Sequence, residues 1–181
     1  AEQSAPGIAA DPACEARATY EWAAAALDLF SGLDASPLLL VNDRVDVALA
    51  LRERGCAGVH LGQGDLPPQA ARDVLGEVPL IGLSTHDVRQ VVFAGDHPVD
   101  YLGLGPIFAS STKGYERGLG AEVCWVAASG TSLPIFAIGG IQPSNASELE
   151  RLGRAAISSA LLCAADPVGQ ARALRAGLRG L

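Results

Sequence analysis

The stretch VPLIGLSTHDVRQVVFAGDHPVDYLGLG, residues 78–105, shows the fold unit that the rest of the chain repeats. Its two ends, 78–84 and 99–105, are short aliphatic runs with little polar alternation, which is typical of strands buried on both faces. The segment between them, 86–94, has the length and composition of a short helix. A strand, a helix and a second strand in this order predict a parallel βαβ unit.

The same alternation continues on both sides of this unit. Each aliphatic run is followed by a segment with helical spacing, and several of these segments open with a capping residue or a proline. The predicted helix starts are Asp43, the pair Pro67-Pro68, Thr85 and Ser144. Further strands are predicted at 37–42, 57–61, 133–140 and 155–161, and further helices at 12–31, 44–54, 67–75, 120–129, 144–152 and 166–178.

This pattern predicts an α/β fold, a (β/α)8 TIM barrel that lacks, or has altered, its first strand-helix-strand portion. A complete barrel usually needs at least about 200 residues, and the chain has 181. No strand can be placed before the helix at 12–31. We expect one domain over 1–181, with a loose N-terminal stretch at 1–10. The sequence leaves open whether the chain is truncated at its N-terminus, whether the sheet closes in another way, or whether it stays open.

Composition and charge exclude several classes of partner. Hydrophobic residues make up 49% and aromatic residues only 5%, so the core consists mainly of Ala, Val, Leu and Ile. The net charge of −7 argues against binding to nucleic acid or to an anionic membrane surface. No apolar run reaches the roughly 18 residues of a membrane span. The four widely spaced cysteines predict reduced thiols in a cytoplasmic protein. The oligomeric state stays open.

Acidic residues follow two neighbouring predicted strands. In parallel βα folds, ligands bind at the carboxyl ends of the strands. Asp43 and Asp65 lie there, beside Asn42 and Gln63. These oxygen-bearing side chains suit a hard cation such as Mg²⁺. The alternatives are a helix cap at Asp43 and a turn or cap at Asp65.

Two small-residue segments at the last predicted strand ends suggest a phosphate site. IGGI, residues 138–141, has two glycines that let a ligand approach the backbone. SSA, residues 158–160, adds two hydroxyl groups beside it. Loops in these positions of a barrel often bind phosphate through backbone N–H groups. An ordinary strand-to-helix turn is the alternative for either segment.

Lys113 is the only lysine, because the other twelve of the thirteen basic side chains are arginines. It lies in SSTKGY, residues 110–115, within the longest predicted loop at the carboxyl ends. A compact ammonium group there suits a phosphate or a departing group; the alternative is a solvated loop lysine. His60 either contacts a ligand or has a role in the core or in support of a ligand-contacting residue, and the sequence leaves these open, whereas His86 and His97 are expected to be structural.

Five segments of the chain closely resemble the thiamine phosphate synthase family, which includes the TenI-like proteins. The resemblance runs in order from about 37 to 161. It implies a (β/α)8 barrel and a transferase that condenses hydroxymethylpyrimidine diphosphate with thiazole phosphate to give thiamine phosphate and pyrophosphate. The segments are VNDRVDVAL (41–49), GVHLGQGDLP (58–67), IGLSTH (81–86), DYLGLGPIFASSTK (100–113) and FAIGGIQPSNA (136–146).

The resemblance also implies roles for individual residues. Asp43 and Asp65 are expected to bind Mg²⁺. Lys113 and Ser84 are the expected catalytic residues, and together with Asn42 they are expected to hold the pyrimidine diphosphate. The partners are therefore phosphorylated small molecules. The residues expected to hold the thiazole phosphate are Ser110, Ser111, Thr112, Gly140, Ser158 and Ser159.

The chain departs from the family pattern at two places. The family carries a Gln-x-Arg-x-Lys type segment before its first long helix, whereas here no residue before Arg17 is basic. Ser158 replaces the usual aliphatic residue of an Ile-Ser pair. Two alternative functions follow. A TenI-like thiazole tautomerase is disfavoured because that branch carries a histidine in place of Pro106. The other alternative is a non-catalytic barrel that binds a phosphorylated ligand.

Overall fold

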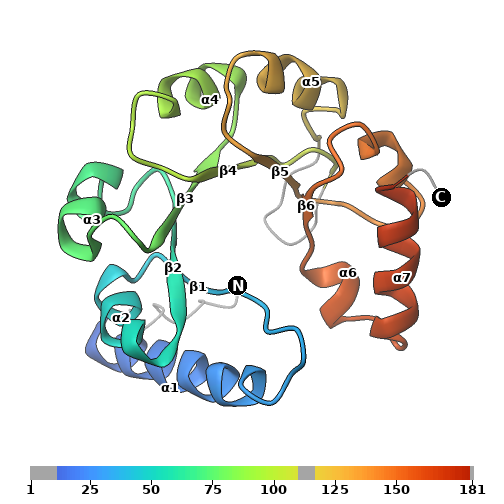
Figure 1. Cartoon of the computed structure of the whole chain (residues 1–181). Helices are drawn as coiled ribbons and strands as arrows, with labels where there is room; N and C mark the ends of the chain where they lie inside the picture. Colours follow the sequence, from blue (N-terminus) through green and yellow to red (C-terminus); the bar gives the residue numbers. More distant parts are fainter. Residues whose placement is uncertain (1–11, 110–116, 180–181) are drawn as a thin grey trace, which may run out of the picture.

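Six parallel strands form one curved sheet in the computed structural model, which describes residues 12–109 and 117–179. Each strand pairs with the next one along the chain, and Figure 1 shows the sheet as an arc with helices on its outer side. Over the described residues β1 and β6 do not pair, so the sheet is a partial barrel. The strands are β1 (Leu39–Asn42), β2 (Cys56–Leu61), β3 (Leu80–Thr85), β4 (Tyr101–Leu104), β5 (Ile135–Ile138) and β6 (Ala155–Ala156).

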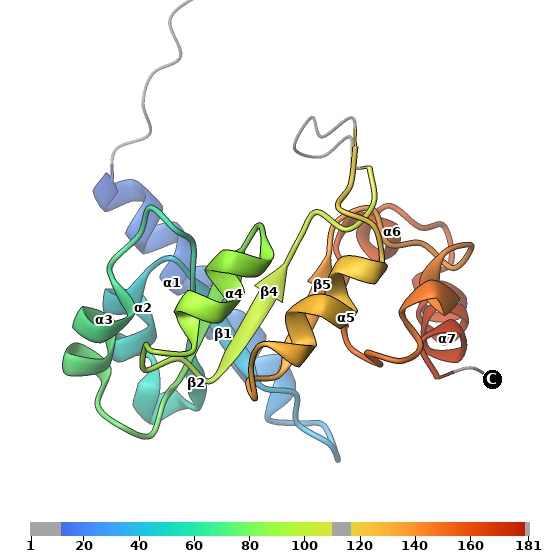
Figure 2. The same cartoon turned by 90° about the horizontal axis from the view of Figure 1, so that it is seen from above.

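Helices alternate with the strands, as expected for βα units. Figure 2 shows α1 and α7 at opposite ends of the molecule, with α4 and α5 between them. None of the helices in the described part combines the length and the apolar character needed to cross a bilayer. The α-helices are α1 (Pro12–Phe30), α2 (Val45–Ala50), α3 (Pro68–Leu75), α4 (Val88–Ala94), α5 (Glu122–Ser129), α6 (Ser159–Leu162) and α7 (Pro167–Gly177); the 3₁₀ helices are η1 (Arg52–Arg54) and η3 (Ala146–Leu149).

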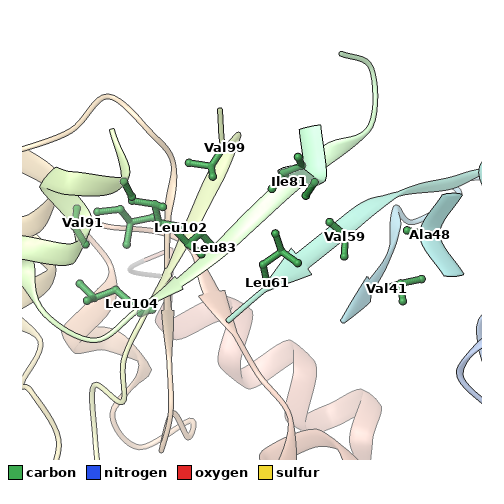
Figure 3. Packing of buried hydrophobic residues seen from close by; sticks show 14 of the residues in the cluster. Val41, Ala48, Val59, Leu61, Ile81, Leu83, Val91, Val99, Leu102 and Leu104 are labelled. Atoms are coloured by element: carbon green, nitrogen blue, oxygen red, sulfur yellow. The ribbon is translucent and has the colours of Figure 1, made fainter. Parts of the chain in front are cut away.

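The hydrophobic core lies between the outer face of the sheet and the helices. Val59, Ile81 and Leu102, on three adjacent strands, are completely buried. Val91 of α4 and Ala48 of α2 belong to the same cluster, and Figure 3 shows these aliphatic side chains together. Burial of aliphatic surface of this kind stabilises a fold by about 25 cal/mol per Å². The core therefore consists of small aliphatic residues, as the composition predicts.

The inner, concave face of the sheet is less buried than the outer face, so the expectation that the strands are buried on both faces is wrong. His60, Ser84, Tyr101 and Phe136 are only half-buried there, and Ile138 is 41% exposed. A closed barrel covers this face with side chains from the opposite strands. Here the sheet does not close over the described residues, which leaves polar side chains of the concave face accessible.

The last predicted strand, 155–161, is divided between a short strand and a helix. Only Ala155 and Ala156 pair with β5, whereas Ser159–Leu162 forms α6. Small residues and leucine suit both structures, so a short run of them does not distinguish a strand from a helix. The helix predicted at 144–152 is also shorter, because only Ala146–Leu149 is helical and it is 3₁₀.

Three of the four predicted helix starts are wrong, and only Pro67-Pro68 is confirmed, as the cap and first residue of α3. Asp43 has a left-handed backbone with φ of 62° before the cap position of α2. Thr85 is the last residue of β3, where its hydroxyl donates to Gly103 O at 2.8 Å. These polar residues belong to strand ends and local turns that precede the helices. The cap positions belong instead to Arg44, Asp87 and Asn145.

A buried arginine links two loops at the amino ends of the strands. Arg72 of α3 is 8% exposed, and its guanidinium donates to Pro79 O at 2.7 Å and to Asp100 Oδ2 at 2.8 Å. The same Asp100 oxygen accepts from the N–H of Ile81 at 2.7 Å. Because these bonds satisfy the charge away from solvent, they hold the starts of β3 and β4 together.

Candidate functional site

One pocket of about 270 Å³ lies at the carboxyl ends of four strands. Parallel strands bring these ends to the same edge of the sheet, which is why residues distant in sequence meet there. The lining residues come from the ends of β3 to β6 and the loops that follow. They are Ser84, Thr85, His86, Gly105, Pro106, Ile138, Gly139, Gly140, Ile141, Ala156, Ile157, Ser158, Ser159 and Ala160.

Ser84 is held in this pocket by two residues of the preceding βα unit. Its hydroxyl lies 2.9 Å from His60 Nε2. Its carbonyl oxygen accepts from the Gln63 side-chain amide at 2.6 Å. The other ring nitrogen of His60, Nδ1, lies 2.9 Å from the hydroxyl of Tyr101. Ser84 is therefore the pocket end of a hydrogen-bonded series that begins at Tyr101.

Burial shifts the pKa of two members of this series. It lowers the pKa of His60 below its usual value, because the charged imidazolium is desolvated. It raises the pKa of Tyr101 to about 12. Both groups are therefore neutral at physiological pH, and the series is a chain of neutral hydrogen bonds.

His86 lines the pocket from the end of β3. Its Nδ1 lies 2.8 Å from Gly105 O, and a carbonyl oxygen can only accept, so Nδ1 carries the hydrogen. Its backbone N–H donates to the Gln90 side chain at 2.8 Å. The ring therefore has the anchored role that the sequence predicts, but it also forms part of the pocket wall.

The diglycine turn after β5 has a backbone that favours glycine at both positions. Gly139 and Gly140 have φ of 94° and 65°. A Cβ atom on Gly140 would lie 2.3 Å from Ala109 O, so the neighbouring loop already requires glycine there. Asn145 holds the turn, since its side chain donates to Gly140 O at 3.0 Å and accepts from the N–H of Gln142 at 2.8 Å.

Ser158 and Ser159 line the same pocket as this turn. Ser158 occupies the cap position of α6, yet its side chain makes no capping hydrogen bond. Both residues are exposed. Their hydroxyl groups are therefore available to a ligand beside the diglycine turn, which is the arrangement expected of a phosphate site.

The two acidic residues lie at the β1–β2 part of the same edge. The N–H of Asp43 donates to His60 O at 2.8 Å, which places Asp43 beside the end of β2. Asp65 Oδ2 accepts from the N–H of Gly62 at 2.6 Å, which fixes this carboxylate against the loop after β2. The described residues contain no group of three or more acidic, histidine or cysteine side chains suited to a metal. Mg²⁺ commonly takes one or two carboxylates and completes its shell with water and phosphate oxygens.

The structure brings some of the predicted site residues together and separates others. Ser84, Gly140, Ser158 and Ser159 line one pocket. Asn42, Asp43 and Asp65 lie at the ends of β1 and β2, on the same edge but outside that lining. The predicted residues Ser110, Ser111, Thr112 and Lys113 lie outside the described residues.

Sequence reasoning missed two residues that shape the site. Tyr101 reaches Ser84 only through His60, and its place in an aliphatic run gave no polar signal. Asn145 holds the diglycine turn, and its short spacing from Gly140 is a signal that could have identified it. A contact between residues of different strands, far apart in sequence, produces no local sequence pattern. A turn held by an Asn side chain does produce one.

Comparisons with known proteins agree on one family. The family model described as thiamine monophosphate synthase matches residues 10–161. A relative named thiamine-phosphate synthase from Synechococcus is 46% identical over 136 residues, which cover 74% of this chain and 38% of the relative. Another with the same name, from Azorhizobium caulinodans, is 41% identical over 170 residues, or 91% of this chain and 77% of the relative. The chain thus spans little more than a third of the length of the first of these relatives.

A solved structure shares the fold and part of the sequence. The thiamine phosphate pyrophosphorylase of Pyrococcus furiosus superimposes with a TM-score of 0.78 and is 32% identical; the match covers 91% of this chain and 78% of that chain.

Proposed function

Since the chain belongs to the thiamine monophosphate synthase family, we propose that it is a transferase of thiamine biosynthesis. It condenses hydroxymethylpyrimidine diphosphate with thiazole phosphate and releases pyrophosphate. The observation that carries this proposal is the pocket in which Ser84, the diglycine turn and Ser158 meet. Its hydroxyl groups and small residues suit a phosphorylated ligand, and it lies where a barrel binds its substrate.

The chemistry needs positioning and charge stabilisation more than a general base. The bond between the pyrimidine methylene carbon and the diphosphate oxygen breaks, and its electron pair leaves with pyrophosphate. The thiazole nitrogen supplies the electron pair of the new C–N bond and carries no proton to remove. We assign the thiazole phosphate to Gly140, Ser158 and Ser159, which would align the nitrogen with the methylene carbon.

In the same proposal, Ser84 and Asn42 bind the pyrimidine diphosphate. Lys113 is the cation that offsets the negative charge on the leaving group. Ser84 lies in the pocket wall, and Asn42 ends the strand next to that of His60. In this proposal, Ser110, Ser111 and Thr112 also bind the thiazole phosphate. Lys113 and these three residues lie outside the described residues, so their part rests on the sequence alone.

We also propose that Asp43 and Asp65 hold Mg²⁺. Bound there, Mg²⁺ would supply positive charge to the diphosphate oxygens. Asp43 fits because the end of β2 fixes its backbone. Asp65 fits because the N–H of Gly62 orients its carboxylate. The cytoplasmic location stays a prediction.

The direct test is to incubate the full chain with both phosphorylated substrates and Mg²⁺ and to measure thiamine phosphate by mass spectrometry. The proposal expects product and pyrophosphate in equal amounts, and neither without Mg²⁺. Absence of product while thiazole phosphate still binds, measured by calorimetry, would contradict the transferase and select a non-catalytic phosphate-binding protein.

A further inference from the structure

The ring of His60 connects hydroxyl groups of two other strands on the concave face. Its Nδ1 lies 2.9 Å from the Tyr101 hydroxyl and its Nε2 lies 2.9 Å from the Ser84 hydroxyl. A neutral imidazole has one donor and one acceptor nitrogen. One hydroxyl group therefore donates to the ring, and the other accepts from it.

The space for this ring is provided by a glycine in the neighbouring strand β3. A Cβ atom on Gly82 would lie 2.5 Å from His60 Nδ1 and 2.1 Å from Tyr101 Cζ. Glycine inside a strand weakens the strand and often marks a close approach of another group. The contact between the His60 ring and the Tyr101 hydroxyl group therefore depends on glycine at position 82.

His60 contacts a residue of the pocket lining without belonging to the lining itself. Ser84 is among the described residues that line the pocket, and His60 is not. The backbone of Ser84 is fixed separately, because its carbonyl oxygen accepts from Gln63 at 2.6 Å. The ring contacts Ser84 at its hydroxyl group, not at its backbone.

Resting on the function proposed above, we propose that His60 is a positioning residue that sets Ser84 as a hydrogen-bond donor to a phosphate oxygen of the substrate. In this arrangement Tyr101 donates to Nδ1, and Nε2–H donates to Ser84 Oγ. The Ser84 hydrogen then points into the pocket. In the opposite arrangement this hydrogen points at the ring, and only lone pairs face the anionic ligand.

Two substitutions of His60 separate its two contacts. An Asn side chain places its polar atoms near Nδ1, so His60→Asn keeps the contact to Tyr101 and loses the one to Ser84. A Gln side chain reaches the position of Nε2, so His60→Gln keeps the contact to Ser84. We expect kcat/KM for the pyrimidine diphosphate to fall roughly tenfold in His60→Asn and by about threefold at most in His60→Gln. The KM for thiazole phosphate should not change.

A Ser84→Ala background tests whether His60 acts through Ser84. There, adding His60→Asn should produce no further loss, because the positioned hydroxyl is absent. Equal losses in His60→Asn and His60→Gln, or an undiminished effect of His60→Asn in the Ser84→Ala background, would overturn the inference.

A measurement without turnover separates this inference from the proposed function. In the ¹⁵N NMR spectrum of the histidine-labelled full chain, in mildly alkaline buffer, we expect His60 to carry its hydrogen on Nε2. The resonance is assigned by its absence from His60→Gln. Tyr101→Phe should mix the two tautomers. A hydrogen on Nδ1 in the parent protein would overturn the inference, whether or not the parent protein forms thiamine phosphate. If the parent protein carries the hydrogen on Nε2 but forms no thiamine phosphate, only the proposed transferase function is contradicted.

Discussion

At the scale of single residues, the lone lysine carries the largest proposed share of the chemistry. Lys113→Ala should lower the condensation rate by on the order of 10²-fold, because a preorganised cation stabilises the charge that develops on the leaving group. Steady-state kinetics with both substrates measures the rate. Arg52→Ala is the matched control, since it removes one positive charge beside the start of β2, at the opposite edge of the sheet. Equal rates in Lys113→Ala and the control would remove Lys113 from the mechanism.

The acidic pair predicts a change in metal dependence. Asp43→Asn or Asp65→Asn should raise the Mg²⁺ concentration that gives half-maximal rate by roughly tenfold or more, because an amide is a weaker ligand than a carboxylate for a hard cation. Magnesium titrations of the reaction rate measure this. Asp96→Asn serves as the control, because Asp96 is an exposed residue between α4 and β4. Titration curves that coincide for all variants would exclude the pair as the metal site.

The sequence was sufficient to predict which residues lie at the strand ends. It was not sufficient to predict which other residues they contact. The positions of Ser84, Gly140, Ser158 and Ser159 follow from the rule that parallel strands gather their carboxyl ends at one edge. The contact between His60 and Ser84 joins residues 24 apart in sequence. It depends on the register of β2 against β3, and a run of aliphatic residues does not specify a register.

At the scale of secondary-structure elements, the buried arginine of α3 predicts a stability effect away from the site. Arg72→Met should destabilise the protein by about 3 kcal/mol, because it removes the charged donor that Asp100 and several carbonyl oxygens share. The bonds to Pro79 O and Asp100 Oδ2 are the shortest of the set, at 2.7 Å and 2.8 Å. Urea unfolding followed by circular dichroism measures the free energy of unfolding.

The control for this prediction is an exposed ion pair. Arg52 and Glu53 lie 3.3 Å apart with side chains 51% and 88% exposed. Exposed pairs contribute little to stability because water and salt screen them. Arg52→Met should therefore unfold at the same urea concentration as the parent. If Arg72→Met also did so, the link between the loops before β3 and β4 would have no energetic role.

Most elements were predictable, and the failures have physical causes. The unit at 78–105 was predicted closely, because β3, α4 and β4 differ clearly in composition and are separated by polar turns. The predicted strand at 155–161 failed, because Ser159–Leu162 suits a helix as well as a strand. The cap at Thr85 failed, because a threonine at a strand end bonds across to Gly103. Local propensity decides little where two structures are close in free energy.

At the scale of the whole molecule, the partial barrel accounts for the accessible concave face. Over the described residues, β1 and β6 are the edge strands of the sheet. Figure 1 shows the arc of strands between them. Several large apolar side chains near β1 are exposed, among them Trp22 at 80% and Leu38 at 69%. The sequence predicted this architecture from a count of βα units. It did not predict that His60 and Tyr101 would be half-buried, because the coverage of a face depends on the closure of the sheet.

The central claim is that the carboxyl edge of this partial barrel holds both phosphorylated groups in one site. The most direct measurement is a crystal structure of the full chain with thiazole phosphate, pyrophosphate and Mg²⁺. The account predicts the thiazole phosphate between Gly140 and Ser158, and pyrophosphate with Mg²⁺ between Ser84 and the two carboxylates of Asp43 and Asp65. Ligand density at the amino edge of the sheet, or binding of the two anions at separate surfaces, would contradict it.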